Sequence, residues 1–167
     1  MYSYKILEQS KQHILTLEDV KNYTRISTDN DNDLLESMMN SAVQIAENFI
    51  KISLVKKVIE VESGNLMNIR LPFVPVIEIT RVTADEIDIN LGDIKVNREI
   101  LSLSKHVECK KLKIIYVAGH DDVSLVPAPI IQGIMLHISS MYDARGVGTV
   151  SLDSIFTLYQ PYRKMVL

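Results

Sequence analysis

Asp29, Asp31 and Asp33 alternate along a short polar stretch, and this alternation is typical of the first ligands in a calcium-binding loop. Such a loop also needs a glycine at its sixth position for the sharp turn and a glutamate at its twelfth for bidentate ligation. The chain has Leu34 and Asn40 at those positions. We therefore interpret the stretch as an acidic turn that caps the following helix.

Two further groups contain residue types that could support catalysis or metal binding. His106 and Cys109 are potential zinc ligands, but a zinc site needs three or four, and the other histidines lie far apart in the chain. His120 and Asp121 have the order of a base and its orienting carboxylate, yet the sequence offers no nucleophile beside them. The six glycines form no phosphate-binding loop. We expect no catalytic residue, no metal ligand and no cofactor, and hence no enzyme.

The composition is typical of a globular protein of one domain. The chain has 167 residues, of which 47% are hydrophobic and 23% charged, and its net charge is −3. No segment is basic enough to bind nucleic acid tightly through its phosphates. A single cysteine excludes an internal disulfide and favours a reducing compartment. Residues 123–142 carry no formal charge, but prolines and polar residues interrupt them, which favours a buried helix over a membrane span.

Helical periodicity predicts two helices in the first third of the chain. Thr16 and Asp19 have the spacing of a capping pattern, so a short helix is expected over residues 17–23. Apolar residues from Leu34 to Ile50 then follow one wide stripe at helical spacing, which predicts a long helix over residues 31–50. Acidic groups at its start suit the helix dipole.

The middle of the chain changes to a period of two. Alternation near residues 58–63, 77–82 and 111–117, with turn signals between these stretches, predicts five to seven short antiparallel strands. Pro72 and Pro75 place Phe73 and Val74 at a strand edge or a crossover. The fold class is therefore α+β: a small helical bundle, helical over 14–52 and 125–145, with a β-rich antiparallel insertion over 54–118.

The C-terminal segment, residues 149–167, concentrates bulky side chains after a predicted hinge at Gly146 and Gly148. Tyrosine and arginine dominate the energetics of many interfaces, so we predict a docking tail. Its proposed contact residues are Phe156, Leu158, Tyr159, Pro161, Tyr162 and Arg163. The alternative is a short helix, stopped at Pro161, that folds back on its own core.

The order of these parts resembles the head–tail connector (adaptor) proteins of long-tailed bacteriophages, prophages and gene transfer agents. The matching stretches are 17–26, the aspartate-rich turn, 33–48, 116–121, 126–135, 141–145 and 161–163. The β-rich middle matches only as a type of insertion. His120 departs from the family pattern, and so does Gly133, where alanine would favour the helix by about 1 kcal/mol.

The resemblance implies a structural virion protein that forms a ring, typically of twelve copies, beneath the capsid portal. Such a ring joins head to tail and extends the DNA channel. The implied partners are the portal protein, a tail-side stopper or tail-completion protein, other copies of the chain, and double-stranded DNA that passes through without sequence-specific binding. No membrane is involved. The implied location is the head–tail junction of the virion, and the cytoplasm of the bacterial host during assembly.

A ring needs two different faces on each subunit, and the helices over 31–50 and 127–145 are the candidates. Their subunit-packing residues are Leu35, Met38, Met39, Phe49, Ile131, Ile134, Met135 and Met141. Two alternatives stay open at this stage. One is a small α+β binding or regulatory module that dimerises through the helix at 31–50, and the other is a small enzyme with a site near His106 and His120.

Overall fold

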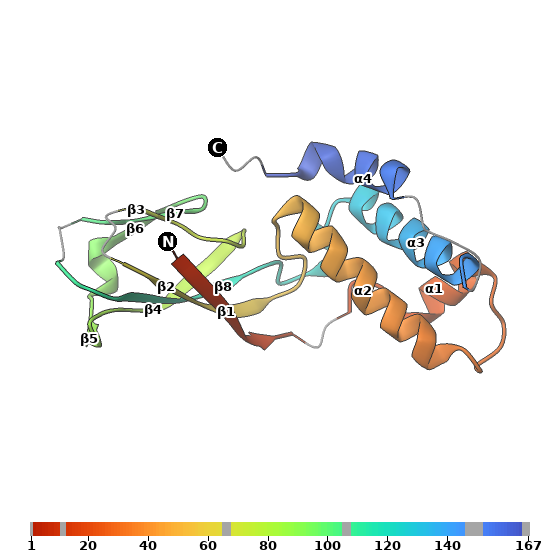
Figure 1. Cartoon of the computed structure of the whole chain (residues 1–167), viewed down its shortest axis with the longest axis horizontal. Helices are drawn as coiled ribbons and strands as arrows, with labels where there is room; N and C mark the ends of the chain where they lie inside the picture. The colour runs from red at the N-terminus through yellow and green to blue at the C-terminus, as the bar shows by residue number, and fades with distance from the viewer. Residues whose placement is uncertain (1, 11–12, 65–67, 105–107, 146–151, 165–167) are drawn as a thin grey trace. The chain divides into compact units, whose positions relative to one another are not determined.

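The computed structural model describes residues 2–10, 13–64, 68–104, 108–145 and 152–164 (Figure 1). The chain divides into two compact units. A β unit contains residues 1–12 and 55–121, and a helical unit contains residues 13–54 and 122–167. Helices and antiparallel sheets occur together, so the predicted α+β class is confirmed. That the two units form one domain stays a prediction.

The helical unit begins with α1 (Leu17–Thr24), which starts where the capping pattern predicts. The Thr16 side chain accepts a hydrogen bond from the Asp19 amide at 3.1 Å, and the Thr16 amide donates to the Asp19 carboxylate at 2.9 Å. This reciprocal capping box satisfies two amides that the first helical turn leaves without partners. Arg25 ends the helix in a left-handed conformation, with φ of 57°.

The long second helix, α2 (Asn32–Ile50), confirms the clearest prediction from periodicity. The apolar stripe faces the interior of the helical unit because its residues recur every three or four positions. Its fully buried apolar residues are Leu35, Ala42, Ala46 and Ile50. Leu34, which the stripe included, lies at its border and is 37% exposed.

Helix α3 (Ala128–Asp143) starts directly after Pro127, which the first turn tolerates because that amide needs no partner. It packs against α1, α2 and α4 (Asp153–Tyr159). These contacts explain the lack of charge in its sequence. Among the described residues, no helix is both long enough and apolar enough to span a membrane. A short 3-10 turn, η2 (Val123–Leu125), precedes α3, and another, η3 (Gln160–Tyr162), follows α4.

The predicted stop of the last helix at Pro161 is nearly correct. The α-helix ends at Tyr159 and the chain continues through Pro161 as the 3-10 turn η3. The predicted hinge at Gly146 and Gly148 lies outside the described residues. Helix α3 ends before it, at Asp143.

The β unit contains a five-stranded antiparallel sheet with the order β1-β2-β8-β4-β5. Its strands are β1 (Tyr2–Gln9), β2 (Lys57–Ser63), β4 (Val76–Ala84), β5 (Ile87–Asp88) and β8 (Leu112–Ala118). A three-stranded sheet has the order β3-β7-β6, with β3 (Asn68–Arg70), β6 (Ile94–Asn97) and β7 (Ile100–Leu103). The prediction of five to seven strands missed β1.

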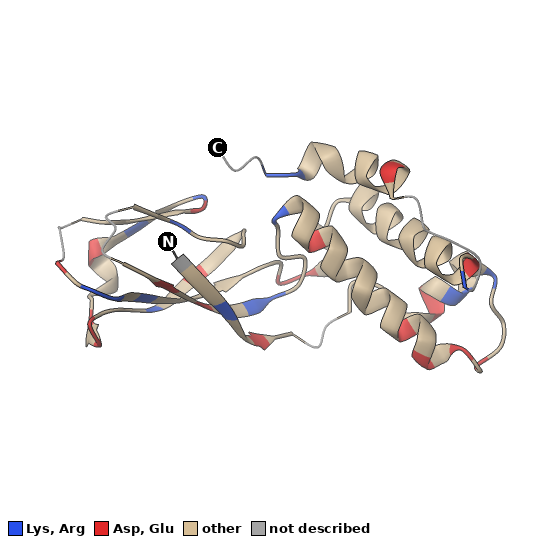
Figure 2. Cartoon of the chain, in the orientation of Figure 1, with Lys and Arg blue, Asp and Glu red and all other residues tan. Residues whose placement is uncertain are grey.

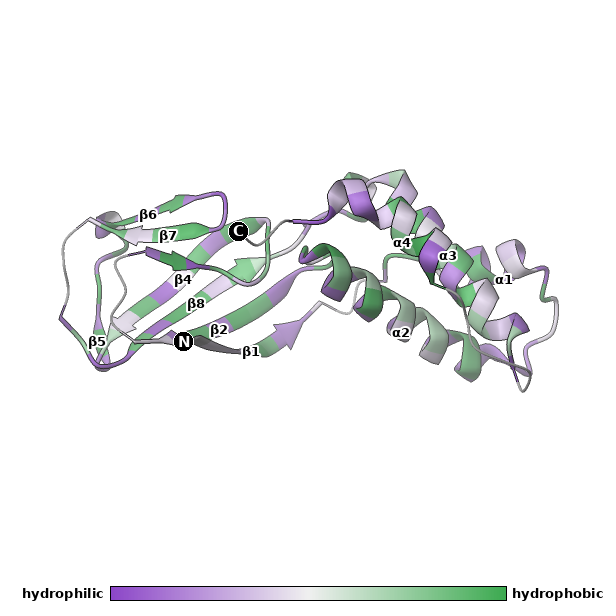
Figure 3. Cartoon of the chain, turned by 45° about the horizontal axis from the view of Figure 1, so that its top comes forward, coloured by the Kyte–Doolittle hydropathy of each residue, from purple (hydrophilic) through white to green (hydrophobic). Residues whose placement is uncertain are grey.

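The hydrophobic core of the β unit lies on one face of the five-stranded sheet. Side chains alternate strictly along β2 between buried and half-buried positions. Hydrophobic and hydrophilic residues are interspersed along the strands of this sheet (Figure 3). Tyr116 on β8 is fully buried, and its hydroxyl bonds the backbone of Phe73 at 3.2 Å and 3.3 Å. The stretch around Phe73 is a crossover between the sheets, one of the two roles that its flanking prolines predicted.

Candidate interaction surfaces

The aspartates that resembled a calcium loop contact residues of the helical unit. Asp29 forms a 2.6 Å ion pair with Lys21, and this bond lowers the pKa of its carboxyl. Asp31 accepts a hydrogen bond from Tyr142. No group of three or more His, Cys, Asp or Glu residues is arranged to hold a metal in the described part of the chain. The turn thus connects α1 to α2. Its predicted capping role is wrong for the N-cap residue Asp31, whose side chain makes no capping hydrogen bond to α2 and instead accepts the bond from Tyr142.

The carboxylates that follow His120 bond to other residues. Asp121 forms a 3.0 Å ion pair with Lys56, and Asp122 caps η2 by accepting a bond from the Ser124 amide. The His120 imidazole is half-buried, and this burial lowers its pKa. Burial, and then the nearby Asp85, raise the pKa of the Cys109 thiol, so this cysteine is a poor nucleophile. His106 lies outside the described residues.

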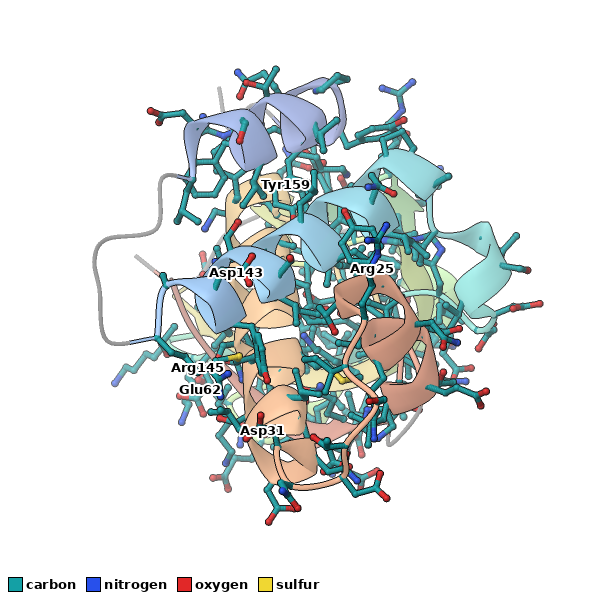
Figure 4. All side chains as sticks on the ribbon, turned by 90° about the vertical axis from the view of Figure 1, so that its right-hand side faces the viewer. Arg25, Asp31, Glu62, Asp143, Arg145 and Tyr159 are labelled. Carbon is teal, nitrogen blue, oxygen red and sulfur yellow. The ribbon has the colours of Figure 1, made fainter. Side chains whose placement is uncertain are left out.

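Three residues form a clamp that joins the start of α2 to the end of α3. The Tyr142 hydroxyl donates to Asp31 at 2.6 Å, and the Arg145 guanidinium reaches the same carboxylate at 3.4 Å (Figure 4). Arg145 also stacks on the Tyr142 ring, with its Cζ atom 3.6 Å from the ring centre. The Tyr142 bond and, more weakly, Arg145 lower the pKa of the Asp31 carboxyl. Through Asp31, the acidic turn therefore joins the start of α2 to the end of α3.

The C-terminal segment folds back onto the helical unit, as the alternative interpretation predicted. The Phe156 ring stacks on Phe49 of α2, with centroids 4.4 Å apart and an interplanar angle of 2°. The Arg163 guanidinium lies over the same Phe49 ring, 5.0 Å from its centroid. The Lys164 amide donates to the Ile50 carbonyl at 3.0 Å. Phe49 is thus the residue of α2 that holds the tail.

Tyr159 anchors α4 to α3 and explains the unexpected glycine at position 133. A Cβ atom at Gly133 would overlap Cε1 of the Tyr159 ring and lie only 2.9 Å from Cζ. Tyr159 is fully buried where α4 faces α3 (Figure 4), and its hydroxyl has no hydrogen-bond partner among the described residues. Burial raises the pKa of this phenol far above its usual value. The departure of Gly133 from the family pattern is therefore a packing requirement.

The predicted interface residues divide into three groups by exposure. Leu35, Met39, Ile134 and Tyr159 are buried inside the helical unit; Met38, Phe49, Ile131, Met135, Met141, Phe156, Leu158 and Tyr162 are half-buried; Pro161 and Arg163 are exposed. The buried group forms the core of the subunit, so only the other two groups present side chains to a partner. That these residues mediate docking and subunit packing stays a prediction.

The outer face of the five-stranded sheet carries a ladder of paired charges (Figure 2). Glu60 lies 3.7 Å from Lys5 and 3.6 Å from Lys113, while Glu62 lies 2.8 Å from Lys111 and 3.6 Å from Lys113. These contacts alternate in sign across three strands, which stabilises the pairing of the strands. A shallow hollow of about 350 Å³ beside the ladder is lined by Lys111, Lys113 and Arg81. Because these cations already pair with carboxylates, the hollow is not a strong anion site.

Comparison with protein families identifies the N-terminal half of this architecture. Residues 14–82, which include α1 and α2, match the model of the phage gp6-like head–tail connector protein family. Over these residues the chain is similar to head–tail connector proteins. A search of curated protein sequences finds no match.

Solved structures share the fold of this chain along almost its whole length. One similar chain comes from the neck of an empty gene transfer agent particle: it is 15% identical, has a TM-score of 0.82, and the match covers 99% of this chain and 97% of that chain. A chain from the virion of a native particle is also 15% identical, with a TM-score of 0.80 and coverage of 98% and 96%. A chain from the neck of a native particle has 15% identity, a TM-score of 0.70 and coverage of 96% and 97%. The β-rich part is therefore shared with these neck proteins.

Sequence reasoning missed two features of the structure. It assigned no strand to residues 2–9, although Tyr4 and Ile6 alternate with Ser3 and Lys5 in the period of a strand. It also noted Gly133 without finding the partner that requires it. No local signal connects Gly133 to Tyr159, because the contact joins residues 26 positions apart.

Proposed function

We propose that this chain forms a ring of twelve copies beneath the capsid portal, where it joins the head to the tail. The match of residues 14–82 to the connector family carries this proposal. A similar chain occurs in the neck of a native gene transfer agent particle whose structure has C12 symmetry, which supports the twelve-fold ring. The proposed location is the head–tail junction of the virion, after assembly in the cytoplasm of the bacterial host.

The proposed partners are the portal protein on one side and a stopper or tail-completion protein on the other. The portal contact is assigned to the solvent-facing side of the C-terminal segment. There Pro161 and Arg163 are exposed, and Leu158 and Tyr162 are half-buried. Phe156 and Tyr159 would instead hold the segment on its own subunit, since Tyr159 is buried and Phe156 stacks on Phe49.

Contacts between helical units in the ring are assigned to the apolar residues of α2 and α3 that remain half-buried. Met38, Ile131, Met135 and Met141 keep part of their side chains accessible in the isolated unit. Methionine and isoleucine side chains on such a surface gain free energy when a neighbouring subunit removes them from water. The two helices would provide the two different faces that a closed ring needs.

Double-stranded DNA is proposed to pass through the ring without sequence-specific binding. The net charge is −3, and Lys5, Lys111 and Lys113 on the outer face of the sheet pair with glutamates, which reduces their availability for phosphate contacts. Few phosphate contacts would let DNA slide, because each one adds to the free energy that holds DNA in place. The ring would thus extend the channel without retaining the genome.

Co-purification with the portal protein tests the assignment of the docking face. The Tyr162→Ala, Arg163→Ala double variant is expected to weaken portal binding by about tenfold or more, since both residue types often dominate interfaces. Gln160→Ala is the matched control, because this exposed residue lies in the same 3-10 turn. Both variants should keep the circular dichroism spectrum of the wild type. Equal portal binding by the double variant and the wild type would refute the docking face.

A further inference from the structure

The five-stranded sheet has open stretches on both of its lateral edges. β1 forms one edge, and β4 with the two-residue strand β5 forms the other (Figure 1). An edge strand presents backbone N–H and C=O groups that another strand is able to pair with, and natural proteins usually protect such edges. The two edges therefore need an explanation.

The β1 edge is poorly protected against pairing. Every side chain from Ser3 to Gln9 is exposed, including the large apolar residues Tyr4 (49%), Ile6 (42%) and Leu7 (39%). The strand contains no proline, and its pairing with β2 is regular from Tyr2 to Ile6. A bulge follows between Ile6 and Glu8, so the regular part of the edge is about five residues long.

On the opposite edge, residues 76–81 of β4 have no strand partner on their outer side among the described residues, although the 3-10 turn η1 (Leu91–Asp93) also contacts β4. Beyond that stretch, β5 pairs with Thr83 and Ala84, and the Ile89 amide donates to the Val82 carbonyl. Ile77 in the open stretch is 37% exposed. Among the described residues, Glu78 has no salt-bridge partner. The open stretch of β4 thus matches the regular stretch of β1 in length.

The directions of the strands make these two edges complementary to one another. β1, β2, β8 and β4 are neighbours in this order, and each pair is antiparallel. Four alternating strands place β1 antiparallel to β4. A second copy shifted sideways, without being turned over, therefore presents its β1 antiparallel to the first copy's β4. We propose that β1 of one subunit pairs with β4 of the next, so that the sheets form a continuous belt in the ring.

Steric and electrostatic considerations select the same register for this pairing. In an unshifted register Lys5 would meet Arg81, and Tyr4 would meet Val82, whose carbonyl is already bonded to Ile89. A shift of two ladder positions away from β5, which spans three residues of β4 because of the bulge between Ile79 and Arg81, moves Tyr4 off Val82. It places Lys5 opposite Glu78, which gives opposite charges.

The same register places apolar side chains together on the other face. Tyr4 comes opposite Ile79, and both side chains point to the face of the sheet that holds the core, because their partners Val61 and Tyr116 are buried there. Aromatic and β-branched residues form favourable cross-strand pairs. The bulges of β4, between Val76 and Glu78 and between Ile79 and Arg81, keep the contact short. The pairing therefore belongs to a larger ring interface and does not by itself hold a dimer.

Disulfide trapping tests the proposal, which rests on the proposed ring. The variant carries Lys5→Cys and Glu78→Cys together with Cys109→Ser, which removes the native thiol. Within one subunit, β1 and β4 are three strand spacings apart, about 14 Å. A disulfide needs Cα atoms within about 7 Å, so every disulfide that forms must join two subunits. The matched control replaces Glu78→Cys by Arg81→Cys, the unshifted register.

The variants are assembled into particles with their own portal and tail proteins, then oxidised and separated on a non-reducing gel. We expect a ladder of covalent multimers from the 5–78 pair and mostly monomer from the 5–81 pair. Particles that contain the 5–78 variant but yield only monomer would overturn the edge pairing and leave the connector function intact. Absence of the wild-type chain from particles would instead overturn the proposed function.

If the cysteine variant is not incorporated into particles, exchanging the charges at positions 5 and 78 tests the same register. Lys5→Glu and Glu78→Lys are each expected to reduce incorporation, and the double exchange to restore it to near the wild-type amount. Lys5→Glu also places two glutamates opposite each other within one subunit, at Glu60, so its thermal unfolding midpoint is expected to fall slightly. Glu78→Lys disturbs no ion pair among the described residues and is therefore the cleaner single exchange. Single exchanges that assemble normally, or a double exchange that does not recover, would overturn the proposed register.

Discussion

Replacing Gly133 by alanine tests the contact that holds the C-terminal segment to the bundle. An alanine Cβ would overlap Cε1 of Tyr159 and approach Cζ to 2.9 Å and Cδ1 to 3.2 Å. Overpacking of this kind typically costs about 1–3 kcal/mol of stability. Alanine in place of glycine inside a helix contributes about 1 kcal/mol in the opposite direction. We therefore expect Gly133→Ala to lower the free energy of unfolding by about 1 kcal/mol.

The partner variant Tyr159→Ala separates these two contributions. Without the ring, the alanine at position 133 no longer meets an obstacle, so the helix propensity alone remains. Gly133→Ala is then expected to raise the free energy of unfolding by about 1 kcal/mol in the Tyr159→Ala background. The change of sign between the two backgrounds gives a coupling energy of about 2 kcal/mol, a magnitude typical of residues in direct contact.

Equilibrium urea unfolding, followed by circular dichroism at the helix band, measures all four proteins of this cycle. Ser140→Ala in the same helix is the control, because Ser140 is seven residues from Gly133 and therefore about 10 Å further along the helix, so its replacement should have the same small effect in both backgrounds. If Gly133→Ala stabilises the wild type as much as it stabilises Tyr159→Ala, the Tyr159 ring does not lie on Gly133 and the account of the tail is wrong.

Three further predictions concern the helical unit. Asp31→Asn should lower the urea midpoint at pH 7 and reduce the loss of stability on acidification. The folded-state pKa of Asp31 is below its ordinary value, so the stability that this carboxylate contributes is lost as the pH falls through that lowered pKa. An unchanged urea midpoint would show that the bond to Tyr142 contributes nothing. Burial lowers the pKa of His137. The wild type should therefore lose stability as the pH falls below about 6.5, where His137 becomes protonated in the unfolded state but stays neutral in the folded state. His137→Leu should lose less stability between pH 7.5 and 5.5, and an equal loss in both proteins would contradict the burial of this imidazole. Tyr159→Phe removes a hydroxyl without a described partner, so we expect a change in unfolding free energy between zero and a small gain, whereas a loss above about 1 kcal/mol would reveal a hydrogen bond to this hydroxyl.

The helices were predictable from the sequence because their signals are local. The stripe from Leu35 to Ile50 repeats every three or four residues, and the capping box at Thr16 fixes where α1 starts. The strand β1 was missed for a physical reason. It lies at the edge of its sheet and its side chains are exposed on both faces, so its alternation is not reinforced by burial.

The candidate surfaces depend on contacts that sequence spacing does not contain. Three contacts join residues more than twenty positions apart: the ion pair of Asp31 with Arg145, the stacking of Phe156 on Phe49, and the packing of Tyr159 on Gly133. Sequence reasoning recognised the tail residues as unusual but could not separate those that face a partner from those that hold the tail in place. Only the packing shows that Tyr159 is internal and that Arg163 is exposed.

Electron microscopy of the chain bound to its own portal protein tests the central claim most directly. The two proteins are mixed at micromolar concentration, purified as a complex and imaged by negative stain. We predict a ring of twelve copies stacked beneath the portal. A failure to associate, or a chain attached to the portal without forming a ring, would contradict the proposal.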